Sequence, residues 1–267
     1  MPQTFIYLIS QQDFKLVSVN KKIRVVAVSY LNTKPLTYSL ERGAMSEELE
    51  LSFEYPSKLA EKLLNDEADI GLLPVAMIPS LKDPHIISDF CIATNGEVAS
   101  VCLFSNVPLE EIKTIQLDYQ SRTSVALLKV LLKHHWKITP ELIPTTPGFE
   151  DAFSGNTAAL IIGDRALIKR NESKYIYDLG TAWKEMTGLP FVFAAWVSNK
   201  KLSDSFLEKF NKSIENSLLH INDIVASTHF PLYNLDVYYK ENIDYVLDDQ
   251  KRKSMDLFLS YLEQIDF

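Results

Sequence analysis

Hydrophobic and polar positions along the chain switch repeatedly between the spacing of buried strands and the spacing of amphipathic helices. The β-branched run ending at Val28 predicts a buried strand that stops at Ser29 and leads into a short helix over residues 33–42. Thr33 is the expected cap of this helix and Gly43 its stop. Further strands are predicted at residues 49–55, 68–74, 86–94, 98–104, 114–117, 158–162 and 191–198, with helices after Pro56, Pro74 and Gly163 and over 121–134.

The C-terminal third has a different pattern, because its apolar residues recur about every four positions. The first such stripe consists of Phe206, Phe210, Ile214, Leu218, Ile221 and Val225, and the second of Met255, Phe258, Leu259, Leu262 and Ile265. The two stripes predict a long amphipathic helix followed by another at the end of the chain.

The alternation of strand, helix and parallel return predicts an α/β fold. Two extended crossings, near residues 96–100 and 194–199, indicate two lobes with a ligand cleft between them. On this basis we expect an N-terminal extension at 1–21, a first lobe from 22–97 plus 199–267, and a second lobe from 98–198.

Polar groups follow the first strand at the point where a ligand is expected. Tyr30, Asn32 and Thr33 lie between the end of this strand and Pro35, which is typical of a helix start. Ligands of open α/β sheets bind at such strand ends, because free backbone N–H groups and side chains converge there. The segment therefore predicts the floor of a pocket.

Composition excludes several partners. The 267 residues, 46% hydrophobic and 23% charged, are typical of a globular protein of one or two domains. A net charge of −8 leaves no basic field for nucleic acid or anionic lipid, and no run of 18 apolar residues predicts a membrane span. Cys91 and Cys102 lack the spacing of a metal site or a disulfide framework and are expected to be reduced core residues.

The first twenty residues contain a short apolar run, 5–9, without a basic start or a cleavage site. They do not resemble a secretory signal, so we expect the protein in the cytoplasm. Either they form a disordered or loosely docked extension, or the true start lies near Lys21.

Six segments in order along the chain, 29–36, 68–75, 100–105, 121–124, 162–164 and 187–193, resemble the chorismate dehydratases of the futalosine route to menaquinone. The resemblance runs from about residue 23 to about residue 199. It implies a two-lobe, type II periplasmic-binding-protein-like fold. It also implies a cytoplasmic hydro-lyase that removes water from chorismate to give 3-[(1-carboxyvinyl)oxy]benzoate.

Chorismate carries two carboxylates, so groups that bind anions are the first expected feature of its site. Hydroxyls and backbone N–H groups are expected to point from one helix start, at Ser121, Arg122, Thr123 and Ser124. We expect this segment to hold a carboxylate, with Arg122 adding its charge. The alternative is an ordinary helix cap with a solvated Arg122.

Asn32 and Ser100 are the expected catalytic residues. The Asn32 carboxamide donates and accepts without ionising, which suits the C4 hydroxyl or a carboxylate of the substrate. Ser100 resembles a pocket position of the family, although a serine in a crossing strand can equally bond neighbouring backbone. The further expected substrate contacts are Ser29, Tyr30, Leu31, Thr145, Thr146, Gly163 and Asp164, of which the two threonines have a simple turn as the alternative.

No histidine or glutamate falls within the six segments as an obvious general base, and no metal, nucleotide or flavin motif is present. We therefore expect no cofactor and no metal. The proton at C3 is expected to go to the enolpyruvyl carboxylate of the substrate itself, with Asp164 as the alternative base. A helix cap is a sufficient explanation of Asp164, and Asp69 is expected to brace a loop or a cap.

Two other classes of protein share this kind of fold. A solute-binding receptor is expected to carry an export signal, and the effector domain of a regulator a DNA-reading helix-turn-helix. Neither is found, which favours the lyase over both classes. A non-catalytic solute-binding protein for small carboxylates is kept as the alternative. The sequence leaves open whether the protein is a monomer or a homodimer.

Overall fold

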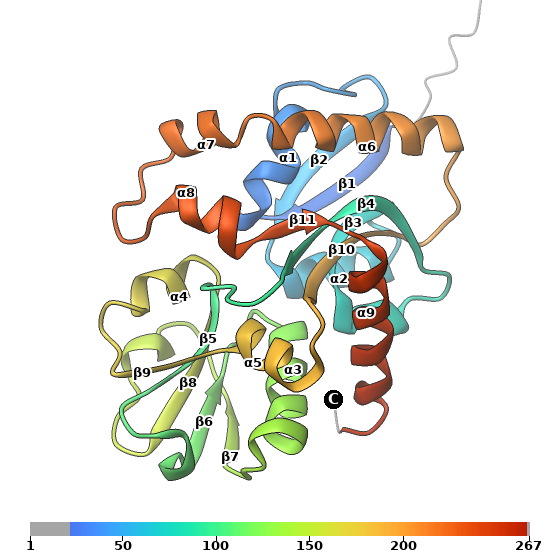
Figure 1. Ribbon diagram of the computed structural model, residues 1–267. Coiled ribbons are helices and arrows are strands. Elements are labelled where there is room, and N and C mark those ends of the chain that lie inside the picture. Colours follow the sequence, from blue (N-terminus) through green and yellow to red (C-terminus); the bar gives the residue numbers. More distant parts are fainter. Residues whose placement is uncertain (1–21, 266–267) are drawn as a thin grey trace, which may run out of the picture.

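Two β-sheets form the centres of two lobes in the computed structural model, which describes residues 22–265 (Figure 1). The first sheet has the strand order β11-β4-β10-β3-β1-β2 and the second the order β7-β6-β8-β5-β9. The strands are β1 (Ile23–Val28), β2 (Leu49–Glu54), β3 (Ile70–Pro74), β4 (His85–Thr94), β5 (Val101–Ser105), β6 (Thr114–Leu117), β7 (Glu141–Pro144), β8 (Thr157–Ile162), β9 (Tyr175–Asp178), β10 (Phe191–Ser198) and β11 (Asp244–Val246). The extension predicted at residues 1–21 lies outside the described residues.

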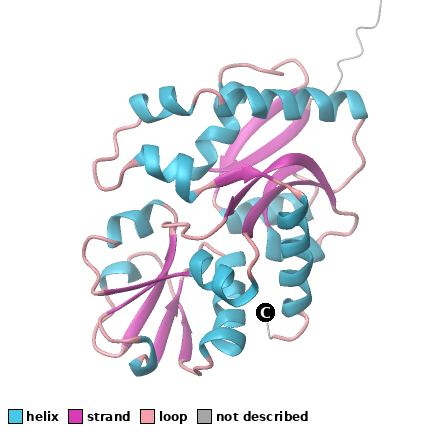
Figure 2. Cartoon of the chain, viewed as in Figure 1, coloured by secondary structure: helices cyan, strands magenta, loops and turns pink. Residues whose placement is uncertain are grey.

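Helices flank both sheets (Figure 2). They are α1 (Lys34–Glu41), α2 (Pro56–Leu64), α3 (Thr123–Leu131), α4 (Asp164–Lys169), α5 (Leu179–Thr187), α6 (Asp204–Leu218), α7 (Ile221–Ser227), α8 (Leu235–Val237) and α9 (Asp249–Leu262). Short 3₁₀ helices, Leu31–Thr33 and Val75–Ser80, follow β1 and β3. The alternation of strands and helices confirms the predicted α/β class.

Parallel pairing brings several strand ends to one place. β1 pairs in parallel with β2 and β3, and β6 pairs in parallel with β7 and β8. Val28, Pro74 and Ile162, the last residues of β1, β3 and β8, all line a cavity between the lobes. The strand-end argument made from the sequence thus holds for both sheets.

β10 requires a correction to the predicted lobes, which assigned residues 191–198 to the second lobe. The strand pairs antiparallel with β3 and β4 in the first sheet, and all its residues are buried. A strand that is apolar up to its last residue, Ser198, is stable in the middle of a covered sheet, not at a hinge. The return crossing therefore precedes β10, at residues 188–190, rather than lying at 194–199.

The C-terminal helices follow the predicted stripes with one interruption. Phe206, Phe210 and Ile214 are buried on α6, which packs against α1, but the chain turns after Leu218 and α7 begins at Ile221. The single helix expected over 206–225 is therefore two. α9 packs against β10 and also against α3 of the second lobe (Figure 1). None of the helices in the described part of the chain has the length and hydrophobicity to cross a bilayer.

Candidate active site

The inner cavity, as we call one of three hollows between the lobes, is lined by residues of both lobes. A mostly apolar wall with a few polar groups that converge on the ligand is typical of small-molecule sites. The first lobe contributes Val28, Tyr30, Asn32, Pro56, Pro74, Ile92, Phe193 and Ala194, and the crossing and second lobe contribute Val98, Val101, Ser121, Thr123, Ser124, Ile162 and Gly163. Most of this wall is apolar, and its polar groups are concentrated at Asn32 and at the start of α3.

Two further hollows adjoin the inner cavity. The outer groove shares Ser121 with it and is otherwise lined by Met77, Ser80, Leu117, Asp118, Tyr119, Arg122, Val125, Lys129, Pro144 and Thr145. The vestibule shares Val28 and Tyr30 with the inner cavity and is otherwise lined by Ser29, Leu31, Thr33, Lys34, Thr37, Glu41, Phe53 and Asp164. Both hollows include residues of both lobes, so the inner cavity lies between two parts of one cleft.

Asn32 lies in the turn that joins β1 to α1, and Pro35 in the first turn of α1 sets the helix direction. Its side chain is half-buried and lines the inner cavity. Among the described residues its carboxamide makes one long contact, in which Oδ1 accepts from Thr33 Oγ1 at 3.5 Å. The amide NH₂ group is therefore available to a bound ligand, which is compatible with the role expected from the sequence.

The start of α3 presents hydroxyl groups to the inner cavity. Ser121 Oγ accepts from the backbone N–H of Ser124 at 3.0 Å, and Thr123 Oγ1 accepts from the backbone N–H of Ala76 at 3.2 Å. The second of these bonds joins the two lobes. Because both hydroxyls act as acceptors here, each retains its own proton for donation to a ligand carboxylate.

Arg122 does not take part in this group. Its side chain is exposed and lines the outer groove, and it does not line the inner cavity. The two threonines expected at the site also lie outside the inner cavity. Thr145 lines the outer groove and donates to Leu117 O at 2.6 Å, while Thr146 is exposed and lines none of the three hollows. A direct carboxylate clamp by Arg122 therefore has no support in the geometry.

Tyr30 links the two lobes at the border between the inner cavity and the vestibule. Its hydroxyl donates to Gln120 Oε1, and Arg165 Nη2 donates to the same oxygen at 3.0 Å. The same Arg165 nitrogen bonds both carboxylate oxygens of Asp118, at 3.0 and 2.8 Å. Burial raises the pKa of Asp118, although Arg165 opposes this effect, and burial also raises the pKa of Tyr30.

Gln120, Asp118 and Arg165 were not predicted as site residues. A signal for them existed, because Asp118 and Gln120 directly follow β6 and Arg165 follows the 162–164 segment. These residues follow a strand end as Asn32 does, and ligands of open α/β sheets bind at such ends.

Gly163 lies beneath the Tyr30 ring. Its φ of +64° is unfavourable for other residues, and a Cβ built there would lie 3.3 Å from the ring. On the following residue, Asp164 Oδ1 accepts from the backbone N–H of Leu31 at 3.1 Å, which is a further bond between the lobes. Burial raises the pKa of Asp164, which lines the vestibule together with Ser29 and Leu31 and not the inner cavity.

Ser100 is fully buried behind the wall of the inner cavity, which its neighbours Val98 and Val101 line. Its Oγ accepts from Tyr238 Oη at 2.8 Å, and its backbone oxygen accepts from the Gly163 N–H at 2.8 Å. The side chain itself does not line the cavity. In this conformation Ser100 fixes the crossing between the lobes instead of facing a ligand.

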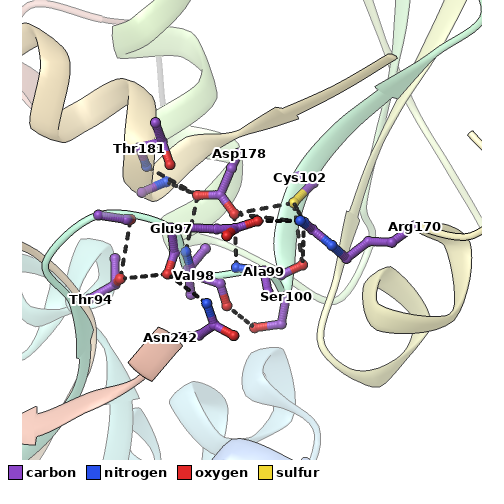
Figure 3. A network of polar contacts seen from close by, with 12 residues as sticks. Thr94, Glu97, Val98, Ala99, Ser100, Cys102, Arg170, Asp178, Thr181 and Asn242 are labelled. Atoms are coloured by element: carbon purple, nitrogen blue, oxygen red, sulfur yellow. Dashed lines mark hydrogen bonds and ion pairs between the residues drawn. The ribbon is translucent and has the colours of Figure 1, made fainter. Parts of the chain in front are cut away.

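Asp178, at the end of β9, fixes the same crossing from the second lobe (Figure 3). Its carboxylate accepts from the backbone N–H groups of Val98 at 3.1 Å and Ala99 at 2.8 Å, and it also caps α5. Ala99 has a φ of +61°, a conformation that costs a non-glycine residue about 1–2 kcal/mol. Arg170 adds a bond to Ala99 O at 3.3 Å and an ion pair with Glu97.

The remaining candidate residues have structural surroundings. Asp69 forms ion pairs with Arg24 and Lys200, which agrees with the loop brace that the sequence offered as its explanation. Cys91 and Cys102 are free and buried. Within residues 22–265, no three His, Cys, Asp or Glu side chains are grouped so as to hold a metal ion.

Two sheets, two crossings and a cavity between them define a two-lobed α/β protein. Solved structures with low sequence identity have the same fold. A protein of Archaeoglobus fulgidus superposes with a TM-score of 0.64 at 16% identity, covering 91% of this chain and 97% of its own. A Candida albicans protein described as having the generic periplasmic-binding-protein fold gives a TM-score of 0.58 at 13% identity, covering 92% and 91%. The predicted two-lobe, periplasmic-binding-protein-like fold is confirmed.

The chain belongs to the menaquinone biosynthesis family, whose pattern it matches over residues 23–264. A chorismate dehydratase of Campylobacter jejuni is 30% identical over 239 residues, which cover 85% of this chain and 91% of the relative. A chorismate dehydratase of Thermus thermophilus is 31% identical over 190 residues, covering 64% and 68%. The family resemblance inferred from the six segments is thereby confirmed.

Proposed function

We propose that this protein is a chorismate dehydratase, a hydro-lyase that converts chorismate to 3-[(1-carboxyvinyl)oxy]benzoate in menaquinone biosynthesis. One observation carries the proposal. In this member of the family, the Asn32 carboxamide and the hydroxyls at the start of α3 line the same inner cavity. The rest of its wall is mostly apolar, which suits a six-membered ring. The relatives that share most of the chain are named for the same activity.

The chemistry requires little beyond a correct pose. The proton leaves C3, its bonding electrons form the new ring double bond, and the C4 hydroxyl departs as water with a proton. The ring becomes aromatic, so the driving force lies in the substrate. The protein has to hold the ring and stabilise the charge that develops during the reaction.

In the proposed complex the Asn32 carboxamide bonds the C4 hydroxyl or the neighbouring carboxylate. The hydroxyls of Ser121, Thr123 and Ser124 receive the other carboxylate, helped by the positive end of the α3 dipole. Ser100 acts by holding the crossing, so that Val98 and Val101 keep the shape of the wall.

The enolpyruvyl carboxylate of chorismate is the proposed base. None of the described residues that line the inner cavity is a His, Asp, Glu or Lys. An apolar wall without a cation raises the basicity of a bound carboxylate. The enolpyruvyl group that carries this carboxylate is attached through its ether oxygen to C3, the carbon that loses the proton. Asp164, the alternative base, lines the vestibule beyond Tyr30.

Asp164→Asn distinguishes the two bases. Loss of a general base lowers kcat by about 10²–10⁴-fold, whereas we expect this variant to retain kcat within about tenfold because it loses only part of a bond between the lobes. A loss of kcat in the first range, in folded protein, would assign the base to Asp164.

The function is tested by incubating dialysed, chelator-treated protein with chorismate and following the aromatic product by chromatography. We expect turnover without added metal, nucleotide or flavin. Binding of chorismate without turnover would favour the alternative, a solute-binding protein. The proposal also places the reaction in the cytoplasm, as the resemblance implies, and cell fractionation tests that part separately.

A further inference from the structure

A dianionic substrate faces an electrostatic problem in approaching this protein. The chain carries a net charge of −8, and at low ionic strength such a field repels an anion over about 10–30 Å. None of the described residues lining the inner cavity carries a formal charge. Attraction of the substrate must therefore come from the regions that lead to the cavity.

The outer groove carries the positive charge. Arg122 and Lys129 line it, seven residues apart and thus two turns apart on the same side of α3. Its acidic residue, Asp118, has a fully buried carboxylate that is paired with Arg165. Farther along, Lys129, Lys133 and Lys137 line one further hollow, and Lys129 and Lys133 line another together with Glu263. A basic stripe therefore leads along this helix to Ser121, which borders the inner cavity.

The vestibule has the opposite character. One cation, Lys34, and two carboxylates, Glu41 and Asp164, line it. The Tyr30 ring separates it from the inner cavity, and the bonds from Tyr30 to Gln120 and from Leu31 to Asp164 join the lobes there. This side of the cleft is more acidic than the outer groove, and two bonds join the lobes here, against the one from Ala76 to Thr123 beside the outer groove.

We infer that the dicarboxylate substrate reaches the inner cavity, and its product leaves, through the outer groove, guided by Arg122 and Lys129. The inference rests on the proposed function for the identity of the ligand. It also gives Arg122 a role that fits its position, because a guiding charge need not touch the bound ligand. A clamp, by contrast, holds the ligand in the complex and slows its release.

This difference can be measured as a rate. Charges along the approach change the association rate constant, whereas a contact in the complex changes the dissociation rate constant. The probe is the product, 3-[(1-carboxyvinyl)oxy]benzoate, mixed with the protein in a stopped-flow instrument and followed by intrinsic fluorescence. Arg122→Gln, Lys129→Gln and the double variant are compared with wild type.

We expect the double variant to associate about 3- to 10-fold more slowly at ~0.01 M ionic strength, where charges act over about 30 Å. The difference should fall below about twofold at ~1 M, where they act over about 3 Å. Dissociation should be unchanged at both concentrations. The matched control is Lys212→Gln, which removes the same charge from an exposed position on α6 and should leave association unchanged.

Three results would overturn the inference. The first is an unchanged association rate constant in the double variant. The second is an equal slowing of association in Lys212→Gln, which would show that the rate depends only on the net charge of the protein. The third is faster dissociation in Arg122→Gln, which would make Arg122 a contact of the bound ligand. If wild-type protein binds neither product nor chorismate, the proposed function has failed and the inference falls with it.

Discussion

Tyr238 Oη donates a hydrogen bond to Ser100 Oγ at 2.8 Å, and both side chains are fully buried. The bond joins the C-terminal part of the first lobe to the crossing that enters the second. It explains why Ser100, which the family resemblance suggested as a catalytic group, does not face the inner cavity. The hydroxyl holds two segments 138 residues apart.

The Ser100–Tyr238 bond makes a stability effect testable. Ser100→Ala leaves the Tyr238 hydroxyl buried without its partner, so we expect a loss of about 1–3 kcal/mol in the free energy of unfolding, measured in urea. Tyr238→Phe should cost less, about 0.5–1.5 kcal/mol, because the small Ser100 hydroxyl retains a long contact with Val98 O. The matched control is Tyr245→Phe, since the buried Tyr245 hydroxyl has no partner within the described residues. Equal losses in Tyr238→Phe and Tyr245→Phe would contradict the assignment.

Asn32→Ala should lower kcat by about tenfold or more with little change in melting temperature, because its carboxamide is free for the transition state and contributes little to folding. Thr146→Ala is the control, since this residue was a candidate from the sequence and is exposed outside all three hollows. Its kcat and KM should be those of wild type. A destabilised Asn32→Ala protein with normal kcat would show that Asn32 stabilises the turn between β1 and α1 and has no part in the reaction.

Gly163→Ala tests the floor beneath Tyr30. The positive φ should cost about 1–3 kcal/mol of stability, and the added methyl group should displace the ring and raise KM about tenfold. Gly155→Ala is matched in strain, because its φ is +60° and nothing lies within 4 Å of a Cβ there. It should lose stability and keep its KM. A raised KM in both variants would show that strain alone, without the Tyr30 contact, disturbs the site.

Asp69 provides a test by pH. Burial would raise the pKa of Asp69, but hydrogen bonds from Arg24 and Lys200 hold it below its ordinary value. The stability from this carboxylate is therefore complete above the unfolded-state pKa of about 3.9 and is lost as the pH falls below it. Asp69→Asn should cost about 1 kcal/mol at pH 7, a value reduced for the exposure of Lys200, and clearly less near pH 2. Urea unfolding at both pH values measures this, and Asp256→Asn, exposed on α9, should follow wild type.

Local patterns predicted the parts of the site that depend on short stretches of chain. Asn32 and the hydroxyls of α3 follow strands directly, and a strand end fixes its next few residues at the edge of its sheet. Tyr30 and Gly163 were found for the same reason. The resemblance of the six segments supplied the family and the two-lobe fold.

The parts that were missed depend on contacts between distant segments. Spacing does not show which way Arg122 points from the start of its helix, and the exposed side chain turns to the outer groove. The partner of Ser100 lies in a region without a recognisable motif. The assignment of β10 to the first sheet depends on its pairing with β3 and β4, which the periodicity of one strand cannot reveal.

If the inner cavity is the proposed active site, the protein converts chorismate there and does not merely bind it. The most direct measurement is a proton NMR time course of chorismate with wild-type protein and with folded Asn32→Ala. We expect the C3 and C4 proton signals of chorismate to disappear as the aromatic signals of 3-[(1-carboxyvinyl)oxy]benzoate grow in equal amount, with the variant slower by about tenfold or more. Chorismate that remains unchanged in the presence of folded wild-type protein, or equal rates for the two proteins, would contradict the account.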